Sequence, residues 1–241
     1  MLNYPANEFA PTLAKSTFVD YQSPKGDFAP VGAVLTAVGI VKLINDWEVI
    51  MNQLTQDDVI RRFQHGESFV NENLANIDLS GTQLAGIDFS EANLSGAIFK
   101  NANLTNANFN DANLSNADLS GAIMQGIYLV GADLTNTNFE DADLQGAFLS
   151  GSTLSGTNFR KADLHRATIG CPHWVTPDPF GSLTSFENAN LKETIFGETA
   201  LKGVILLVAN LQDAYLYEVD LSDAVYRHSD LKDAITKSTR N

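Results

Sequence analysis

The residues of this chain best suited to chemistry lie in one short segment, IGCPHWVTPDPFG at positions 169–181. It holds the only cysteine, Cys171, with His173 two residues later, and His165 precedes it. A thiolate and imidazoles are ligands that zinc and copper accept, so a metal centre is the chemistry to test. Two or three ligands without a recognised spacing are a weak signal, and the surrounding Pro and Gly residues favour a surface loop. We therefore expect no metal and no cofactor.

The rest of the chain offers no catalytic set either. Asp and Glu are frequent, but no nucleophile, base and orienting group can be assembled from their positions. A net charge of -14 disfavours binding to nucleic acid or to an anionic membrane surface. The single cysteine excludes an intramolecular disulfide, and the first residues lack the basic region of a signal peptide. We expect a non-enzymatic, cytoplasmic protein.

Large apolar residues recur at every fifth position along most of the chain. One series runs through 21 consecutive centres from Phe69 to Ile169, and a second runs through 10 from Phe186 to Leu231. A step of five rotates by roughly 140° in an α-helix and alternates faces in a strand, so neither element gathers these residues on one side. The chain is therefore built from a repeat with its own backbone geometry.

Each five-residue unit reads as a short extended side followed by a corner. Ala recurs two positions before the centre, and Asn or Asp often stands between the two. Residues two apart point the same way on extended backbone, so the Ala and the centre face inward together. Gly, Asn and Asp end many units, and these residues tolerate the dihedrals of a turn.

These units closely resemble the A(D/N)LXX motif of the pentapeptide-repeat family, over about residues 67 to 233. The resemblance implies an all-β solenoid, a right-handed quadrilateral parallel β-helix with four units per coil and about eight coils. The helical lead-in resembles that of cyanobacterial members most. Four units per coil should align residues 20 apart, and Phe does fall only in alternate columns at that spacing, such as Phe69, Phe89 and Phe109.

The chain divides into six parts on this interpretation. Residues 54–66 read as an N-terminal α-helical cap, with Thr55 as N-cap and Gly66 as the stop. The expected parts are an N-terminal arm with an apolar segment and a helix (1–53), the capping helix (54–66), the first repeat block (67–169), an inserted loop (170–181), the second repeat block (182–233) and a C-terminal tail (234–241).

Apolar residues at outward positions are the candidate partner-binding residues, because a contiguous exposed apolar patch usually marks an interface. The repeat normally holds Asn or Asp there. The candidates on the repeats are Ile123, Tyr128, Val130, Phe148, Ile195, Ile205, Leu207, Tyr215, Tyr217 and Val225. The loop adds His173 and Trp174, and the arm adds Val34, Leu35 and Val38. An equal alternative is that residues 1–53 fold back over one of these patches.

The function expected from these features is a protein-protein interaction scaffold or regulator, whose partner the sequence does not name. The resemblance implies two alternatives, an acidic DNA mimic that binds a type II topoisomerase (gyrase) and a regulator of cyanobacterial differentiation or photosynthetic assembly. A third is peripheral membrane docking through residues 28–44, which are too short to span a bilayer.

Two expectations concern contacts between coils and between chains. Residues 20 apart should be neighbours, so Glu140 should lie against Arg160 and Asp141 against Lys161. The tail after Leu231 is polar and leaves the last coil poorly covered, and some family members dimerise through that coil. An end-to-end homodimer is therefore a further expectation.

Overall fold

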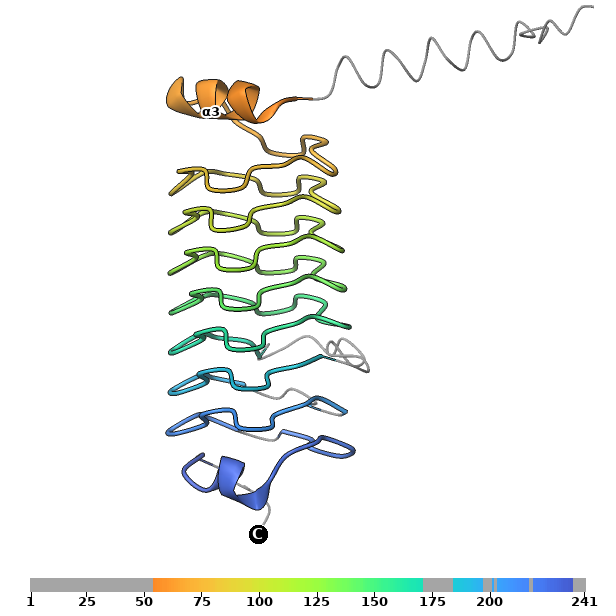
Figure 1. The fold of residues 1–241 in the computed structure, drawn as a ribbon, viewed down its shortest axis with the longest axis vertical. Helices are drawn as coiled ribbons and strands as arrows, with labels where there is room; N and C mark the ends of the chain where they lie inside the picture. The colour runs from red at the N-terminus through yellow and green to blue at the C-terminus, as the bar shows by residue number, and fades with distance from the viewer. Residues whose placement is uncertain (1–53, 171–183, 197–200, 202, 217–218, 236–241) are drawn as a thin grey trace, which may run out of the picture. The chain divides into compact units, whose positions relative to one another are not determined.

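The computed structural model describes residues 54–170, 184–196, 201, 203–216 and 219–235. These residues form a stack of square coils (Figure 1). Short parallel bridges connect residues 20 apart, for example Asn73 with Asn93 and Asn93 with Asn113. Because one coil consumes 20 residues, it contains four five-residue units. The β-helix expected from the repeat is therefore present.

The centres and the small residues before them fill the interior of the stack. Leu94, Phe99, Leu104 and Phe109 are fully buried, and so is Ala97. The columns of Phe expected from the sequence are in contact, since the Phe69 and Phe89 ring centroids lie 5.4 Å apart. Opposing columns also meet, because the Phe99 and Phe109 rings pack edge to face at 5.7 Å. The rings thus join neighbouring coils and opposite walls.

Where Thr or Ser replaces the inward Ala, its hydroxyl is buried and hydrogen-bonded. Thr137 donates to the carbonyl of Leu114 at 2.8 Å, and Thr157 donates to that of Leu134 at 2.9 Å. No buried side-chain nitrogen or oxygen among the described residues lacks a partner. The dry interior therefore accepts these polar residues without an unpaired group.

The corners are left-handed, as the turn residues predicted. Among the described residues, sixteen that are not glycine have positive φ, and eleven of these are Asn or Asp. Asn188 is typical, with φ 59°. Val208 departs from the pattern, because a β-branched residue with φ 62° is a conformational outlier.

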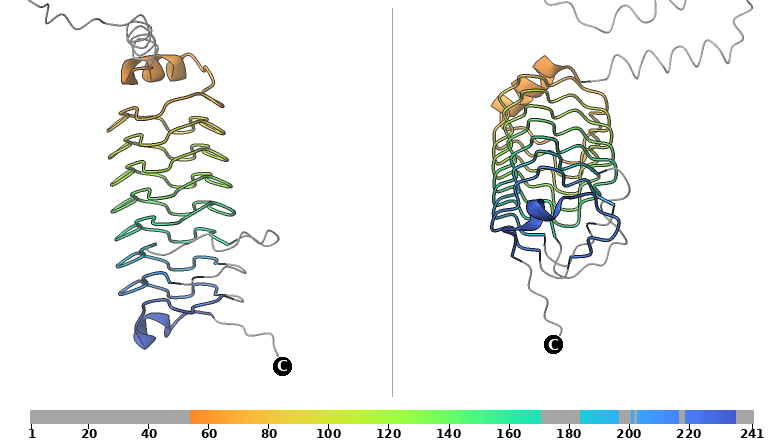
Figure 2. Two further views of the ribbon diagram at one scale, coloured as in Figure 1. Left: turned by 90° about the vertical axis from the view of Figure 1, so that its right-hand side faces the viewer. Right: turned by 60° about the horizontal axis from the view of Figure 1, so that its bottom comes forward.

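One coil is longer than the others. The bridges that join residues 20 apart elsewhere join Asn158 to Ser185, Asp163 to Asn190 and Thr168 to Ile195, a step of 27. Seven additional residues therefore enter this coil between Gly170 and Thr184. The register of the stack is nevertheless kept, and the coils on both sides remain aligned (Figure 2).

A helix, α3, spans Gln56–Gln64 above the first coil (Figure 1). Thr55 is its N-cap and forms a capping box with Asp58, in which the Thr55 hydroxyl also donates to the Asp58 carboxylate at 2.6 Å. Val59 is fully buried and belongs to the same apolar cluster as Phe69. The Arg62 guanidinium lies 4.7 Å from the centre of the Phe69 ring. The helix thereby shields the first coil.

The opposite end carries a short 3-10 helix, η1, at His228–Leu231, in a segment where the sequence predicted repeat units. Tyr226, expected as an inward centre, is 38% exposed, so that assignment was wrong. Leu221 and Leu231 are only partly buried. A centre needs coils on both sides for full burial, and no described coil follows this one. No helix in the described part of the chain has the length and apolar character to cross a membrane.

Candidate protein-binding face

The outward residues form four columns, one for each side of the coil. One column, which we call the apolar ladder, holds five large apolar residues and one Thr in six successive coils. Its members, which we call rungs and which are joined by parallel bridges, are Tyr128, Phe148, Thr168, Ile195, Tyr215 and Ile235. Earlier in the same column the residues are Asp88 and Asn108, so the apolar character begins at Tyr128.

The long coil is what makes this ladder continuous. In sequence, the Tyr128 and Phe148 pair and the Ile195 and Tyr215 pair are separated by an insertion of unknown register. The step of 27 places Ile195 directly beside Thr168, which is itself beside Phe148. Two patches that are separate in the sequence are therefore one face. Thr168 and Ile235 were not among the candidates, and their 20-residue or 27-residue offsets become informative only once the register is known.

The ladder is accessible and ordered along its length. The exposed fractions of Tyr128, Phe148, Ile195 and Tyr215 are 43%, 41%, 47% and 37%. The Tyr128 and Phe148 rings are stacked, with centroids 5.1 Å apart and planes 9° apart. Because each ring covers one side of the next, the ladder presents ring edges and methyl groups to a partner.

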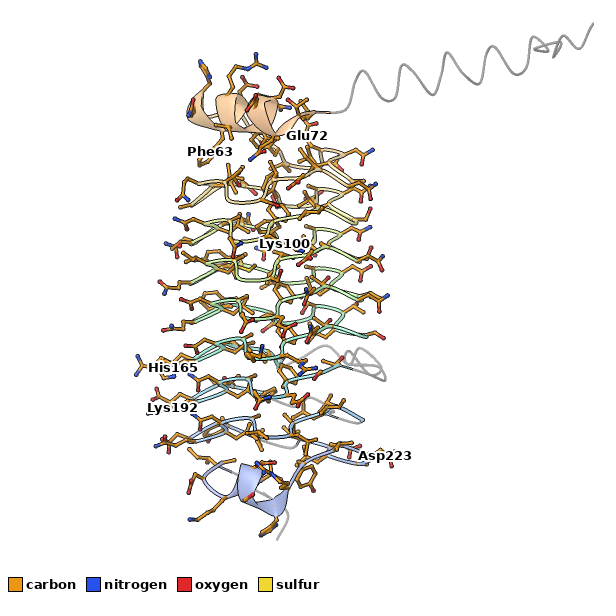
Figure 3. All side chains as sticks on the ribbon, in the orientation of Figure 1. Phe63, Glu72, Lys100, His165, Lys192 and Asp223 are labelled. Atoms are coloured by element: carbon orange, nitrogen blue, oxygen red, sulfur yellow. The ribbon has the colours of Figure 1, made fainter. Side chains whose placement is uncertain are left out.

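The two edges of this face differ in charge. On one edge, two or three residues before each ladder position, lie His165, Arg166, Lys192 and Glu193, which we call the charged edge. Figure 3 shows His165 and Lys192 one above the other on the same side of the stack. His165 Nδ1 lies 3.0 Å from the Lys192 carbonyl, and Arg166 Nε lies 2.7 Å from a Glu193 carboxylate oxygen. The hydrogen bond from Arg166 holds the pKa of Glu193 below its usual value.

The other edge is uncharged where the structure describes it. Val130, Ser150 and Gly170 lie two residues after three successive ladder positions. Val130 is 41% exposed, as expected, and widens the apolar surface beside Tyr128. The Ser150 hydroxyl donates to the Gly170 carbonyl at 2.7 Å, which ties the start of the insertion to the coil before it. We call this the smooth edge.

The remaining candidates do not join the ladder. Ile205 and Val225 belong to another column, together with Ser185, and Leu207 is half-buried. Ile123 is 45% exposed but stands alone between Asn103 and Asp143. Six candidates lie outside the described residues: Val34, Leu35, Val38, His173, Trp174 and Tyr217.

The expected ion pairs are partly corrected. Lys161 does approach Asp141, at 3.7 Å, but its closer partner is Glu140, at 3.1 Å. Arg160 pairs with Glu187 of the following coil at 3.6 Å rather than with Glu140. Corner side chains are long enough to reach either neighbouring coil, so the 20-residue offset does not select the partner. Exposed pairs of this kind contribute under about 1 kcal/mol each.

Within the ranges that the structure describes, no group of three or more His, Cys, Asp or Glu side chains is placed to hold a metal ion. Cys171 and His173 lie outside these ranges. What the described surface offers is shape and apolar area, which suit recognition of another macromolecule.

The fold and this face define a β-helical solenoid with an exposed apolar column. Residues 73–111, 112–151 and 137–169 match the family model described as pentapeptide repeats (8 copies). The chain belongs to the pentapeptide-repeat family. A comparison of its sequence with curated proteins finds no match.

Three solved structures illustrate the likeness. A trypsin-treated variant of QnrB1, described as a plasmid-mediated fluoroquinolone resistance protein, is 20% identical, with 68% of this chain and 84% of that chain covered and a TM-score of 0.50. HetL of Nostoc sp. strain PCC 7120, described as involved in heterocyst differentiation regulation, is 27% identical, with 76% and 94% covered and a TM-score of 0.30. The pentapeptide-repeat protein alr5209, also from Nostoc, is 29% identical, with 47% and 85% covered and a TM-score of 0.33. The first of these likenesses supports the fold alone.

Proposed function

We propose that this protein is a non-enzymatic, cytoplasmic protein-protein interaction scaffold whose binding face is the apolar ladder. The observation that carries the proposal is the run of large apolar residues at outward positions in successive coils, interrupted only by Thr168. Monomeric proteins rarely leave such a contiguous patch in water, and patches of this kind usually mark an interface.

The fold itself does not require apolar residues at these positions. Elsewhere the outward residue is often Asn or Asp, whose side chain stabilises its own corner. Asn113 Oδ1, for example, accepts the Ser115 backbone N–H at 2.9 Å, and Asn93 donates across to Asn73 at 2.9 Å. Tyr, Phe and Ile cannot form these hydrogen bonds. The ladder therefore gives up local stabilisation, which indicates selection for contact with a partner.

The topoisomerase alternative depends on acidic charge rather than on the ladder. A net charge of -14 is compatible with it, but the ladder is apolar and its charged edge includes Arg166 and Lys192. A DNA supercoiling assay with gyrase and this protein separates the two hypotheses. Docking through residues 28–44, whether to a membrane or to a photosynthetic complex, concerns residues outside the described ranges.

The test is affinity capture from an extract of the source organism, with mass spectrometry and three variants. Phe148→Asn and Tyr215→Asn change the ladder, whereas Ile123→Asn changes an equally exposed apolar residue on another side of the coil. Asn is the residue that the repeat itself uses at this position, so all three variants should fold. We expect a partner that the wild type and Ile123→Asn retain and that both ladder variants lose. Retention by all four proteins would refute the proposal.

A further inference from the structure

We propose that the apolar ladder binds a second copy of this chain, packed face to face and antiparallel. This inference rests on the proposed function, because it takes the ladder to be a binding face. It concerns the side of the stack and is distinct from a contact between chain ends.

The spacing of the ladder favours a second copy. Neighbouring rungs are separated by the spacing between strands, about 4.8 Å, so six rungs extend about 24 Å. An α-helix advances about 5.4 Å per turn, and same-side residues of a strand are about 6.6 Å apart, so both lose register along this length. Only another stack of coils repeats at the period of the ladder, so a second copy can oppose every rung.

The order of residues along the ladder is compatible with two-fold symmetry. Its midpoint lies between Thr168 and Ile195, with three rungs on each side. A two-fold axis at this point, perpendicular to the stack, opposes Thr168 to Ile195 of the second copy. It likewise opposes Phe148 to Tyr215, an aromatic pair, and Tyr128 to Ile235. No apolar rung is then left without an opposing rung, which is what an isologous interface requires.

Charge selects the antiparallel arrangement over the parallel one. In the antiparallel dimer the charged edges of the two copies meet with their levels reversed, so Arg166 faces Glu193 of the second copy. Each Arg166 already pairs with its own Glu193, so four alternating charges come together. In a parallel dimer the charged edge would instead face the uncharged smooth edge of Val130, Ser150 and Gly170. Opposite charges across an interface set its orientation.

The available area indicates a reversible dimer. The exposed ladder side chains and Val130 keep roughly two-fifths of their surface, which gives an apolar area on the order of 400 Å² per copy. With the flanking edges, the total buried by two copies is about 1,000 Å², at the lower limit for a specific interface. We therefore expect a concentration-dependent equilibrium between monomer and dimer.

The first experiment is sedimentation equilibrium of the full chain over a wide concentration range. We expect a monomer-dimer equilibrium in the wild type and in Ile123→Asn. Phe148→Asn should weaken it at least tenfold, because it removes both copies of an aromatic contact. A monomer at all concentrations would overturn the inference. A dimer that Phe148→Asn leaves unchanged would also overturn it and would favour a contact through the chain ends.

The orientation is tested by disulfide trapping in a Cys171→Ser background. Chains carrying Phe148→Cys are mixed with chains carrying Tyr215→Cys. The antiparallel dimer predicts a disulfide between the two kinds of chain and little disulfide in either kind alone. Trapping of Phe148→Cys chains mainly with one another would overturn the antiparallel arrangement. These results are independent of the capture experiment, so a monomeric protein that still loses a partner in the ladder variants would leave the proposed function standing.

Discussion

Val208 offers a direct test of how the corners of this solenoid are stabilised. It occupies the last position of a five-residue unit with φ 62°, and its side chain is 51% exposed. Asn188 holds the equivalent corner of the neighbouring coil with φ 59°, and its backbone N–H donates to the Leu207 carbonyl at 3.0 Å. The two positions differ mainly in side chain. Val208→Asn and Asn188→Val are therefore reciprocal substitutions at matched corners.

The expected gain from Val208→Asn follows from two opposing terms. A left-handed residue with a β-carbon costs about 1–2 kcal/mol, and Asn tolerates this conformation better than Val. Replacing a half-exposed Val loses about half of its burial energy, roughly 0.7 kcal/mol. The net stabilisation is about 1 kcal/mol, which raises the Tm by about 2–4 °C for a folded unit of this size. Asn188→Val should lower the Tm by at least as much.

Thermal unfolding followed by circular dichroism measures both changes in the same buffer. An unchanged or lower Tm for Val208→Asn, together with an unchanged Tm for Asn188→Val, would refute the assignment of strain to the left-handed Val. A loss in both variants would instead mean that Val208 contributes more through packing than it costs through its backbone.

Three further changes test the interior and the cap. Phe159→Ala should cost about 4 kcal/mol, because this fully buried ring stacks on Phe139 at 5.1 Å and on Phe186 at 4.9 Å, and a smaller loss in chemical denaturation would mean that the cavity collapses. Thr157→Val should cost about 1 kcal/mol through its lost hydrogen bond to Leu134, and an unchanged denaturation midpoint would contradict that value. Thr55→Ala should cost helix α3 about 1 kcal/mol, visible as faster amide exchange. Hydrogen bonds from the Thr55 hydroxyl and backbone N–H lower the pKa of Asp58 from 3.8, so the stabilisation is complete above pH 3.8 and is lost as the pH falls through the lowered pKa, a dependence that Thr55→Ala should abolish.

The repeat made the interior of this fold predictable. Leu94 and Phe99 were expected to face inward from their spacing alone, and both are fully buried. Such an inference succeeds because each unit contacts mainly its own neighbours, so a local pattern determines local structure. It fails at Tyr226, where the pattern continues but the coils that would bury the side chain do not.

The binding face could be predicted only in fragments. Tyr128 and Phe148 were placed together correctly, because 20 residues separate them within an unbroken series. Ile195 and Tyr215 were also recognised, but their relation to the first pair was not. The number of residues that leave the coil at an insertion cannot be counted from composition.

The sequence by itself determined the square coil, the residues that fill it and the left-handed corners, since all of these depend on contacts within five or twenty residues. Tertiary structure alone decided that the coil containing the insertion takes 27 residues and sets Thr168 beside Ile195. The stacking of backbone hydrogen bonds imposes that alignment, because the chain must re-enter the stack where its N–H and C=O groups find partners. One continuous apolar face is the consequence.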